Sequence, residues 1–279
     1  MILLKVITKT KVIYDNHEDY PSYLMVKKSI PIWIRRLVKV SYKFFFKISE
    51  SVFDFIFYAD PFTSGFDPAK QKQAIIYNYP IVSKYPQKEK KYDLIFPGSV
   101  DLDVCQRLMK IAEEFDKKYS HKIKFLIIGR DVSSENKHLI QSITLKLQNV
   151  ELIFMEDMPF KSVQEYIAES KIGLLPLPNI EKFRKNIPTK LFEYMLHSIP
   201  MLASDLPPIS CFLEKTDGNF VITENDYQNS YIEKISEILD HYPEYRKKCN
   251  LNFQILEQQW NWDRTEKQKL VKIINKMLM

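Results

Sequence analysis

Glycine is scarce in this chain, and the positions of the few glycines exclude one large class of nucleotide-binding enzymes. Only 5 glycines occur among 279 residues, at positions 65, 98, 129, 173 and 218. This spacing leaves no G-x-G-x-x-G turn after any predicted strand. The absence of that turn argues against a dehydrogenase or epimerase that carries the dinucleotide-binding fingerprint.

Cysteines are also few, and long apolar runs are missing. Cys105, Cys211 and Cys249 are odd in number and far apart, which indicates neither a disulfide framework nor a zinc site. This cysteine usage fits a reducing cytoplasm. No segment reaches the roughly 18 uncharged apolar residues of a membrane-spanning helix. The sequence therefore predicts a cytoplasmic protein without a metal site.

The charge balance is mildly basic. Lys and Arg number 41 against 35 Asp and Glu, which gives a net charge of +6 at pH 7. Such an excess suits an anionic ligand or a membrane surface, and a solvated lysine-rich surface explains it equally well. No recognition motif accompanies the charge, so nucleic-acid binding is not predicted.

From residue 92 onward, apolar runs alternate with segments of helical periodicity. Six strands are predicted, at 92–98, 123–130, 150–157, 172–178, 200–205 and 219–223. Their continuous apolar character is typical of strands buried on both faces of a parallel sheet. A further helix is expected at about 227–257, and Gly218 is expected to close a helix. The pattern predicts a doubly wound α/β domain with ligands beyond the carboxyl ends of the strands.

The N-terminal part predicts a smaller, partial domain. Three strands are expected, at 11–19, 55–60 and 74–80. Three strands are too few for an ordinary doubly wound sheet. The expected organisation is a partial domain at 1–84, a linker at 85–91, a main domain at 92–257 and a C-terminal helix at 258–279 that crosses back to the first domain.

One carboxylate stands in an unusual place. Residues 186–205 read NIPTKLFEYMLHSIPMLASD, and Glu193 lies in the middle of an apolar helix. Burying an unpaired carboxylate is costly, so Glu193 either has a structural partner or binds a ligand. Because this helix follows a predicted strand, we expect it at the edge of the sheet where ligands bind.

Several motifs in a fixed order resemble one enzyme family. The GT-B-fold glycosyltransferases of family four carry pieces similar to YDNHED, AIIYNYP, DLIFPGSV, KFLIIGR and PTKLFEYM followed by PMLASD. The resemblance implies an α/β GT-B-like fold with a complete C-terminal and a partial N-terminal Rossmann-like domain. It implies a retaining hexosyltransferase that moves a sugar from a UDP- or GDP-linked donor to a capsular, cell-envelope or lipid-linked glycan. It implies no metal or other cofactor.

The resemblance also implies roles for individual residues. His17 would lie beside the donor sugar as the catalytic residue, with Asp15, Glu18 and Asp19 orienting it or the acceptor. Glu193 would bind the ribose of the nucleotide. The other donor-binding candidates are Gly98, Gly129, Arg130, Asn186, Thr189 and Lys190. Tight turns for the glycines and solvated side chains for the charged residues are the structural alternatives.

Two positions depart from the family pattern. Lys185 stands where the family often has a second glutamate that contacts the donor sugar. Val104 stands about where an arginine neutralises the diphosphate in the family, and Arg107, one helical turn away, and Arg130 are the candidates for that role here. An alternative function therefore stays open, in which a truncated or degenerate relative binds nucleotide, or serves as a partner subunit, without turnover.

The helix expected at 31–55 indicates further partners. It combines Trp33 and three consecutive phenylalanines with several Lys and Arg residues, a pattern typical of helices on an anionic membrane surface. Core packing with the lysines in water is the alternative. A separate chain that supplies further N-terminal strands is a second expected partner. The expected location is the cytoplasm, at the inner face of the cell membrane.

Overall fold

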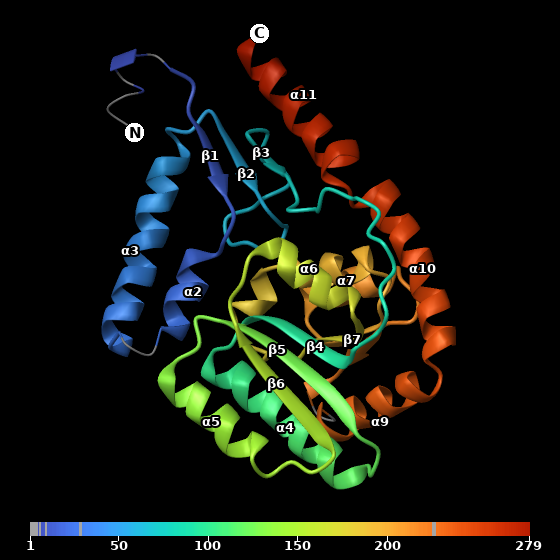
Figure 1. Ribbon diagram of the computed structural model, residues 1–279. Coiled ribbons are helices and arrows are strands. Elements are labelled where there is room, and N and C mark those ends of the chain that lie inside the picture. Colours follow the sequence, from blue (N-terminus) through green and yellow to red (C-terminus); the bar gives the residue numbers. More distant parts are fainter. Residues whose placement is uncertain (1–4, 6, 9, 28–29, 225–226) are drawn as a thin grey trace. The chain divides into compact units, whose positions relative to one another are not determined.

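The computed structural model describes residues 5, 7–8, 10–27, 30–224 and 227–279 (Figure 1). They divide into two compact units. Unit 1 comprises the described residues of 1–79, 180–187 and 262–279, and unit 2 comprises those of 80–179 and 188–261. Each unit contains its own parallel sheet, so the chain has the mixed α/β fold that the alternation of strands and helices predicts.

The sheet of unit 2 has six parallel strands among the described residues. They are β4 (Tyr92–Ser99), β5 (Ile123–Arg130), β6 (Val150–Glu156), β7 (Ser170–Leu175), β8 (Met201–Ser204) and β9 (Phe220–Ile222). Their spatial order is β6-β5-β4-β7-β8-β9. This is the 3-2-1-4-5-6 order of doubly wound nucleotide-binding domains, which reverses between β4 and β7. In such sheets, ligands bind outside the carboxyl ends of the strands at the reversal.

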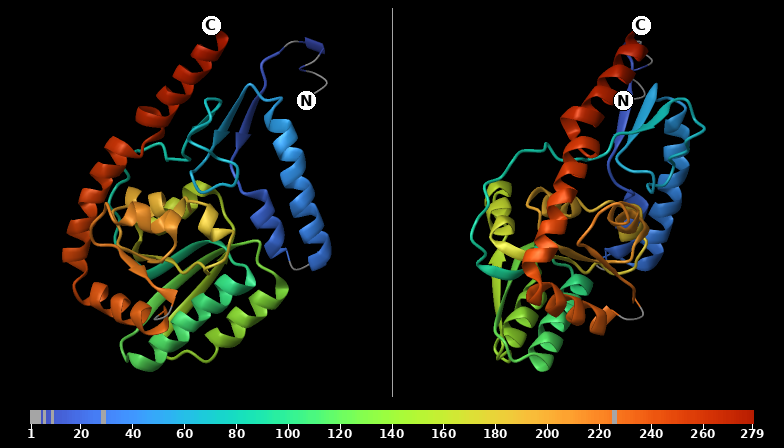
Figure 2. Two further views of the ribbon diagram at one scale, coloured as in Figure 1. Left: turned by 180° about the vertical axis from the view of Figure 1, so that it is seen from behind. Right: turned by 90° about the vertical axis from the view of Figure 1, so that its right-hand side faces the viewer.

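Helices cover both faces of this sheet (Figures 1 and 2). They are α4 (Leu102–Lys118), α5 (Ser134–Thr144), α6 (Phe160–Ala168), α7 (Lys190–Leu196), α8 (Pro207–Leu213), α9 (Tyr227–Asp240) and α10 (Tyr242–Gln259). On one face α4 packs against α5 and α9, and on the other α6 and α10 pack against α7. Apolar residues at helical spacing drive this packing, as in α4, where Leu108, Ile111 and Phe115 are buried.

Unit 1 contains a smaller parallel sheet in the order β1-β2-β3. Its strands are β1 (Ile13–Asn16), β2 (Phe55–Tyr58) and β3 (Gln73–Ile75). Two helices that pack on each other, α2 (Tyr20–Val26) and α3 (Ile32–Glu50), connect β1 to β2. The core of the unit is a small cluster around Phe53, Ile56 and Tyr58. The helix expected at 31–55 therefore ends earlier than predicted, because the chain enters β2 at Phe55.

The C-terminal segment packs within unit 1. A π-helical turn at Trp262–Glu266 leads into α11 (Lys267–Leu278). The buried carboxylate of Glu266 accepts a hydrogen bond from the backbone N–H of Tyr77 at 3.0 Å. Lys269 donates to the carbonyl of Ile75, at the end of β3, at 2.5 Å. These bonds tie the end of the chain to the segment that follows the small sheet.

Two expectations about the C-terminal half are wrong. The helix expected at 227–257 is two helices, since α9 ends at Asp240 and Pro243 stands in the first turn of α10. A proline favours a helix start and breaks a helix interior, which explains the division. Gly218 does not close a helix. It lies beyond the end of α8, with a positive φ of 73° in the turn before β9.

Two kinds of feature are absent from the part of the chain that the structure describes. None of its helices is long and apolar enough to cross a membrane. None of its groups of His, Cys, Asp and Glu side chains has three members placed to hold a metal ion.

Candidate functional site

The carboxyl ends of β4 and β5 bring two of the predicted glycines together. Gly98 and Gly129 are register partners on these neighbouring strands. A Cβ added at Gly129 would lie 2.6 Å from Val132 and 2.8 Å from Phe154, so packing requires glycine there. A Cβ added at Gly98 would meet only Phe96, at an ordinary 3.4 Å. Packing therefore does not require glycine at Gly98, which lies half-buried at the edge where ligands bind.

Arg130 follows Gly129 at the same edge, and its side chain is exposed. Its Nη2 donates to Ser99 Oγ at 3.4 Å, and its Nε lies 3.7 Å from a carboxylate oxygen of Asp131. Exposed contacts of this kind contribute little stability, so the guanidinium can turn toward an anion. Arg107 differs, because it forms an ion pair with Glu224.

Glu193 is buried in α7, at 6% exposure, and it has structural partners. The ammonium of Lys190 lies 2.9 Å from Oε1 and 3.1 Å from Oε2. Gln164, in α6, donates to Oε2 at 2.8 Å, and the hydroxyl of Thr189 donates to Oε1 at 3.3 Å. The i,i+3 spacing puts Lys190 on the same helix face as Glu193. The negative charge of the buried carboxylate is therefore balanced by Lys190, a cation of unit 2.

Gln164 links Glu193 to a histidine that the sequence analysis did not single out. A carboxylate only accepts hydrogen bonds, so the amide NH₂ of Gln164 faces Glu193 and its Oε1 faces His197 Nε2, 2.9 Å away. His197 must then donate from Nε2. Burial, together with the charges of Lys90 and Lys88, lowers the pKa of His197 to about 4. The ring is thus neutral at pH 7, with its hydrogen on Nε2.

Tyr194 anchors α7 on the sheet beside Glu193. Its ring is fully buried, and its hydroxyl donates to the carbonyl of Leu174 at 3.0 Å. A Cβ added at Gly173, in β7, would lie 2.5 Å from that ring. Glycine at this strand position therefore lets α7 approach the sheet closely, which fixes the position of Glu193.

A second polar group missed from the sequence is Ser204, the last residue of β8. Its hydroxyl is buried and has no hydrogen-bond partner among the described residues. Leaving a buried hydroxyl unsatisfied costs free energy unless a ligand or water completes it. Ser204 ends its strand at the same edge of the sheet as Gly98, where a ligand of unit 2 is expected.

His17 belongs to unit 1, where it follows the carboxyl end of β1. Its Nε2 lies 2.8 Å from Asp15 Oδ2, and both side chains are exposed. Asp19 has a structural role, because it caps α2 and accepts hydrogen bonds from the backbone N–H groups of Ser22 and Ser64, at 3.2 and 3.1 Å. The structure thus pairs His17 with Asp15 and uses Asp19 to position the helix that follows.

Lys185 is held in a chain of ion pairs within unit 1. It lies in the short 3₁₀ helix Phe183–Lys185, and its ammonium is 2.8 Å from Glu181 and 3.6 Å from Asp19. Glu181 also pairs with Lys39 at 2.8 Å. Hydrogen bonds from Lys185 and Lys39 lower the pKa of Glu181 to about 2. Asn186 follows directly as the half-buried C-cap of the 3₁₀ helix.

The strand order, with its reversal between β4 and β7, is that of doubly wound nucleotide-binding α/β domains. The comparison with protein families identifies the class more closely. Residues 91–241, just over half of the chain, match the family described as glycosyl transferases group 1. The chain therefore belongs to the group 1 glycosyl transferases. The matched range includes Gly98, Gly129, Lys190 and Glu193.

Solved structures resemble the chain in fold. HepE of Anabaena, in complex with UDP-glucose, has a TM-score of 0.69 at 10% identity, over 98% of this chain and 75% of its own. Sucrose-phosphate synthase of Thermosynechococcus elongatus has a TM-score of 0.67 at 10% identity, over 98% of this chain and 70% of its own. A variant of S. aureus TarM, in complex with UDP, has a TM-score of 0.61 at 17% identity, over 81% of this chain.

The chain spans 44% of the TarM chain, which is less than half of it. At these identities the likeness shows the fold alone, and that fold is GT-B-like with Rossmann-like domains. None of the curated proteins matches the chain.

Proposed function

We propose that this chain transfers a sugar from a UDP- or GDP-linked donor to a glycan, with retention of configuration at the transferred sugar. The observation that carries the proposal is the family match of residues 91–241 to the group 1 glycosyl transferases. The complexes of HepE with UDP-glucose and of TarM with UDP favour a uridine nucleotide. The resemblance of the sequence to family four favours a capsular, cell-envelope or lipid-linked acceptor.

Donor binding in this proposal exchanges the partners of Lys190 and Glu193. The Lys190 ammonium, 2.9 Å from Glu193, turns to the diphosphate, which carries more negative charge than one carboxylate. Glu193 Oε1 then accepts hydrogen bonds from the ribose hydroxyls, while Gln164 keeps its bond to Oε2 and holds the carboxylate in place. The lack of a side chain at Gly98 lets the backbone approach the phosphates, and Arg130 adds a second cation.

Catalysis in this proposal rests on positioning and electrostatics. Negative charge develops on the diphosphate as the bond to the sugar breaks, and Lys190 and Arg130 balance that charge without a metal ion. The family resemblance gives His17 its role on the donor sugar in this proposal, and Asp15, 2.8 Å away, orients its ring. These roles for His17 and the donor-binding residues rest on the family resemblance together with the contacts described above.

The test is sugar release by the purified chain. UDP- and GDP-sugars are offered with and without glycan acceptors, and released nucleotide is measured. We expect release from one nucleotide class, and at least a tenfold loss in His17→Ala with unchanged nucleotide affinity. His138→Ala, at an exposed position of α5, is the control and should keep full activity. The absence of calorimetric binding for every UDP- and GDP-sugar contradicts the proposal.

A second candidate is nucleotide binding without turnover, as a subunit of a larger enzyme. Lys185 favours it, because this lysine occupies the position of a glutamate that the family often uses on the donor sugar, and Glu181 and Asp19 hold its ammonium. This candidate predicts UDP binding with no sugar release by the isolated chain. It further predicts that release begins only when a partner chain is added.

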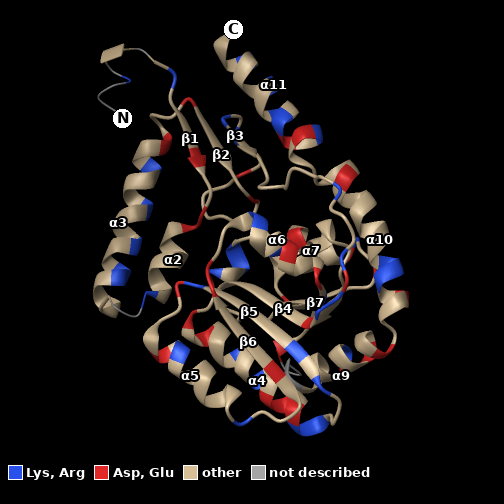
Figure 3. Ribbon diagram, in the orientation of Figure 1, with Lys and Arg blue, Asp and Glu red and all other residues tan. Residues whose placement is uncertain are grey.

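We also propose that α3 rests on an anionic membrane surface, which places the chain at the inner face of the cell membrane. One stripe of the helix is apolar and 48–67% exposed, and it consists of Trp33, Leu37, Val40, Phe44 and Ile48. Helical geometry puts basic side chains directly beside this stripe, namely Arg36, Lys43 and Lys47. Figure 3 shows Lys and Arg at intervals along α3. Exposed apolar residues bordered by cations suit an anionic interface.

Vesicle sedimentation tests this surface. We expect the chain to bind vesicles of phosphatidylcholine with phosphatidylglycerol and not vesicles of phosphatidylcholine alone. Phe44→Glu should abolish binding, whereas Leu145→Glu, at a residue of 87% exposure in unit 2, should leave it intact. If the chain does not bind the anionic vesicles, the membrane proposal is wrong, and a partner chain is expected to cover the apolar stripe of α3 instead.

A further inference from the structure

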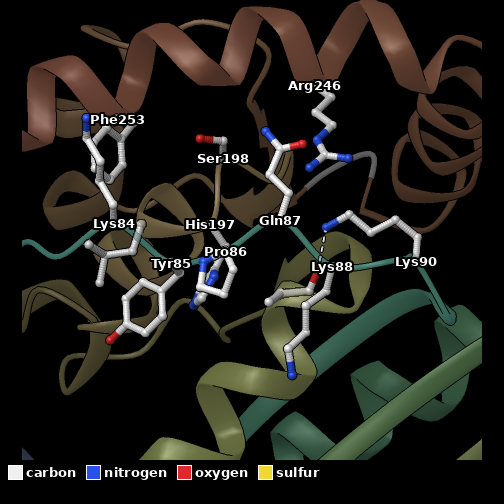
Figure 4. Close-up of a pocket in the computed structure, with 12 residues that line it drawn as sticks. Lys84, Tyr85, Pro86, Gln87, Lys88, Lys90, His197, Ser198, Arg246 and Phe253 are labelled. Atoms are coloured by element: carbon white, nitrogen blue, oxygen red, sulfur yellow. Dashed lines mark hydrogen bonds between the residues drawn. The ribbon is translucent and has the colours of Figure 1, made fainter.

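Unit 2 contains a cavity of about 230 Å³ at the amino ends of its strands (Figure 4). Its wall comes from the segment 84–90, which precedes β4, from Ala168, which precedes β7, and from His197 and Ser198, which precede β8. Helix α10 closes it with Arg246. Because the strands are parallel, this cavity lies at the sheet edge opposite to Gly98 and Ser204.

The cavity carries positive charge that none of its described lining residues compensates. Its described lining residues include four cations, Lys84, Lys88, Lys90 and Arg246, and no Asp or Glu. Lys88 has carboxylate partners outside the cavity, at 3.4 and 3.5 Å. Neither Lys90 nor Arg246 forms an ion pair with a carboxylate of the described residues. The Lys90 ammonium donates to the carbonyl of Ala168 at 2.7 Å.

Two of these cations, Lys90 and Arg246, lie close enough to repel each other. Figure 4 shows the guanidinium of Arg246 and the ammonium of Lys90 extending toward one another, with the amide of Gln87 beside them. Burial, with the charge of Arg246, lowers the pKa of Lys90 to about 7. An anion between the two groups would remove this repulsion and restore a firmly held proton on Lys90.

The remaining wall gives the cavity shape rather than charge. The neutral ring of His197 lies 4.6 Å from the ring of Tyr85, centroid to centroid, and its Nε2 is engaged by Gln164. Ser198 adopts a left-handed backbone with φ 51°, which is uncommon for a residue other than glycine. This conformation ends α7, since the N–H of Ser198 donates to Met195 and that of Ile199 donates to Tyr194.

We propose that this cavity binds a phosphoryl group, either of inorganic phosphate or of a small phosphomonoester, between Arg246 and Lys90. Two cations match the charge of a phosphate dianion, and the guanidinium can donate two parallel hydrogen bonds to its oxygens. A cavity of about 230 Å³ is smaller than an ordinary pocket for a drug-sized ligand, so a whole nucleotide sugar does not fit. The site is separate from the proposed donor site and does not depend on it.

Calorimetric titration of inorganic phosphate, at constant ionic strength and with UDP at saturation, tests the proposal. We expect one saturable site, with affinity lowered at least tenfold in Arg246→Gln and in Lys90→Gln. Lys247→Gln, at the exposed neighbouring position of α10, is the matched control and should change affinity less than twofold. Glucose 1-phosphate in place of phosphate distinguishes the sources: tighter binding assigns the site to a phosphomonoester, and weaker binding to free phosphate.

A labelling experiment on the unaltered chain avoids any dependence on variant folding. A lysine with a pKa of about 7 is largely uncharged at pH 8, so limiting acetic anhydride should modify Lys90 faster than Lys91, whose pKa is raised by Glu169. Phosphate should slow modification of Lys90 at least fivefold and leave Lys91 unaffected, as read by mass spectrometry.

Three results overturn the proposal: no saturable phosphate binding, equal phosphate affinity in Arg246→Gln and the unaltered chain, or displacement of phosphate by UDP. Failure of the proposed glycosyltransferase function gives a different result. In that case UDP does not bind, while phosphate still binds and its affinity still falls in Arg246→Gln.

Discussion

Acid should destabilise the folded chain through one buried side chain, His197. Its surroundings in unit 2 lower its pKa to about 4, through burial first and then through Lys90 and Lys88, from an ordinary value of 6.5. Between these two pH values the unfolded chain binds a proton that the folded chain does not. Stability is therefore complete above pH 6.5 and declines as the pH falls toward 4.

The magnitude follows from the two pKa values. The decline has a slope of about 1.4 kcal/mol per pH unit within the window. It reaches about 2.5 kcal/mol at pH 4.5 and about 3 kcal/mol below pH 4, where both states are protonated. A loss of this size is a large fraction of the stability of an ordinary domain.

Urea unfolding at pH 7.5, 5.5 and 4.5 measures the effect, with the fluorescence of buried Trp260 as a probe of unit 2. His197→Gln is the reference protein, because it keeps a donor for Gln164 and cannot titrate. All other titrating groups are shared, so the difference between the two proteins isolates His197. We expect this difference to change by about 2.5 kcal/mol between pH 7.5 and 4.5. If the free energy of unfolding changes equally with pH in the two proteins, His197 is not a buried side chain that stays neutral in the folded chain.

Three further substitutions test the packing and hydrogen bonds around α7. Gly173→Ala should lower the free energy of unfolding by about 2–3 kcal/mol, because its Cβ would lie 2.5 Å from the fully buried ring of Tyr194; urea unfolding measures this loss. Gln164→Leu should cost about 2–4 kcal/mol, since it removes two buried hydrogen bonds, and should also weaken UDP binding in calorimetry. Ser198→Gly should raise the melting temperature, with a gain of about 0.5–1 kcal/mol, because glycine tolerates a positive φ.

The sheet of unit 2 was predictable because its strands are buried on both faces. Runs such as 123–130 are continuously apolar, and the observed strand β5 has the same bounds. Helix boundaries were harder. Pro243 indicated the break between α9 and α10 in the sequence. The helix was nevertheless predicted as continuous across this proline. The end of α3 had no comparable signal, since it is set by the pairing of β2 with β1.

The candidate site was predictable only in part. The position of Glu193 in an apolar helix pointed to a constrained carboxylate. Lys190, three residues earlier, lies at a spacing that predicts an ion pair on one helix face. The sequence did not indicate the roles of Gln164 and His197. Gln164 bonds both Glu193 and His197 only because α6 packs on α7, and it lies about 30 positions from each of them in the sequence. The opposing cations Lys90 and Arg246 are likewise distant in sequence and meet only in the fold.

Nucleotide affinity of a Glu193 variant is the most direct test of the central claim that unit 2 binds a nucleotide sugar through α7. UDP and GDP are titrated calorimetrically into the unaltered chain, into Glu193→Gln and into Glu165→Gln, a control at an exposed glutamate of α6. We predict that one nucleotide binds the unaltered chain and the control equally, and binds Glu193→Gln at least tenfold more weakly. Equal affinity in Glu193→Gln and the unaltered chain would contradict the claim and leave Glu193 with its structural role alone.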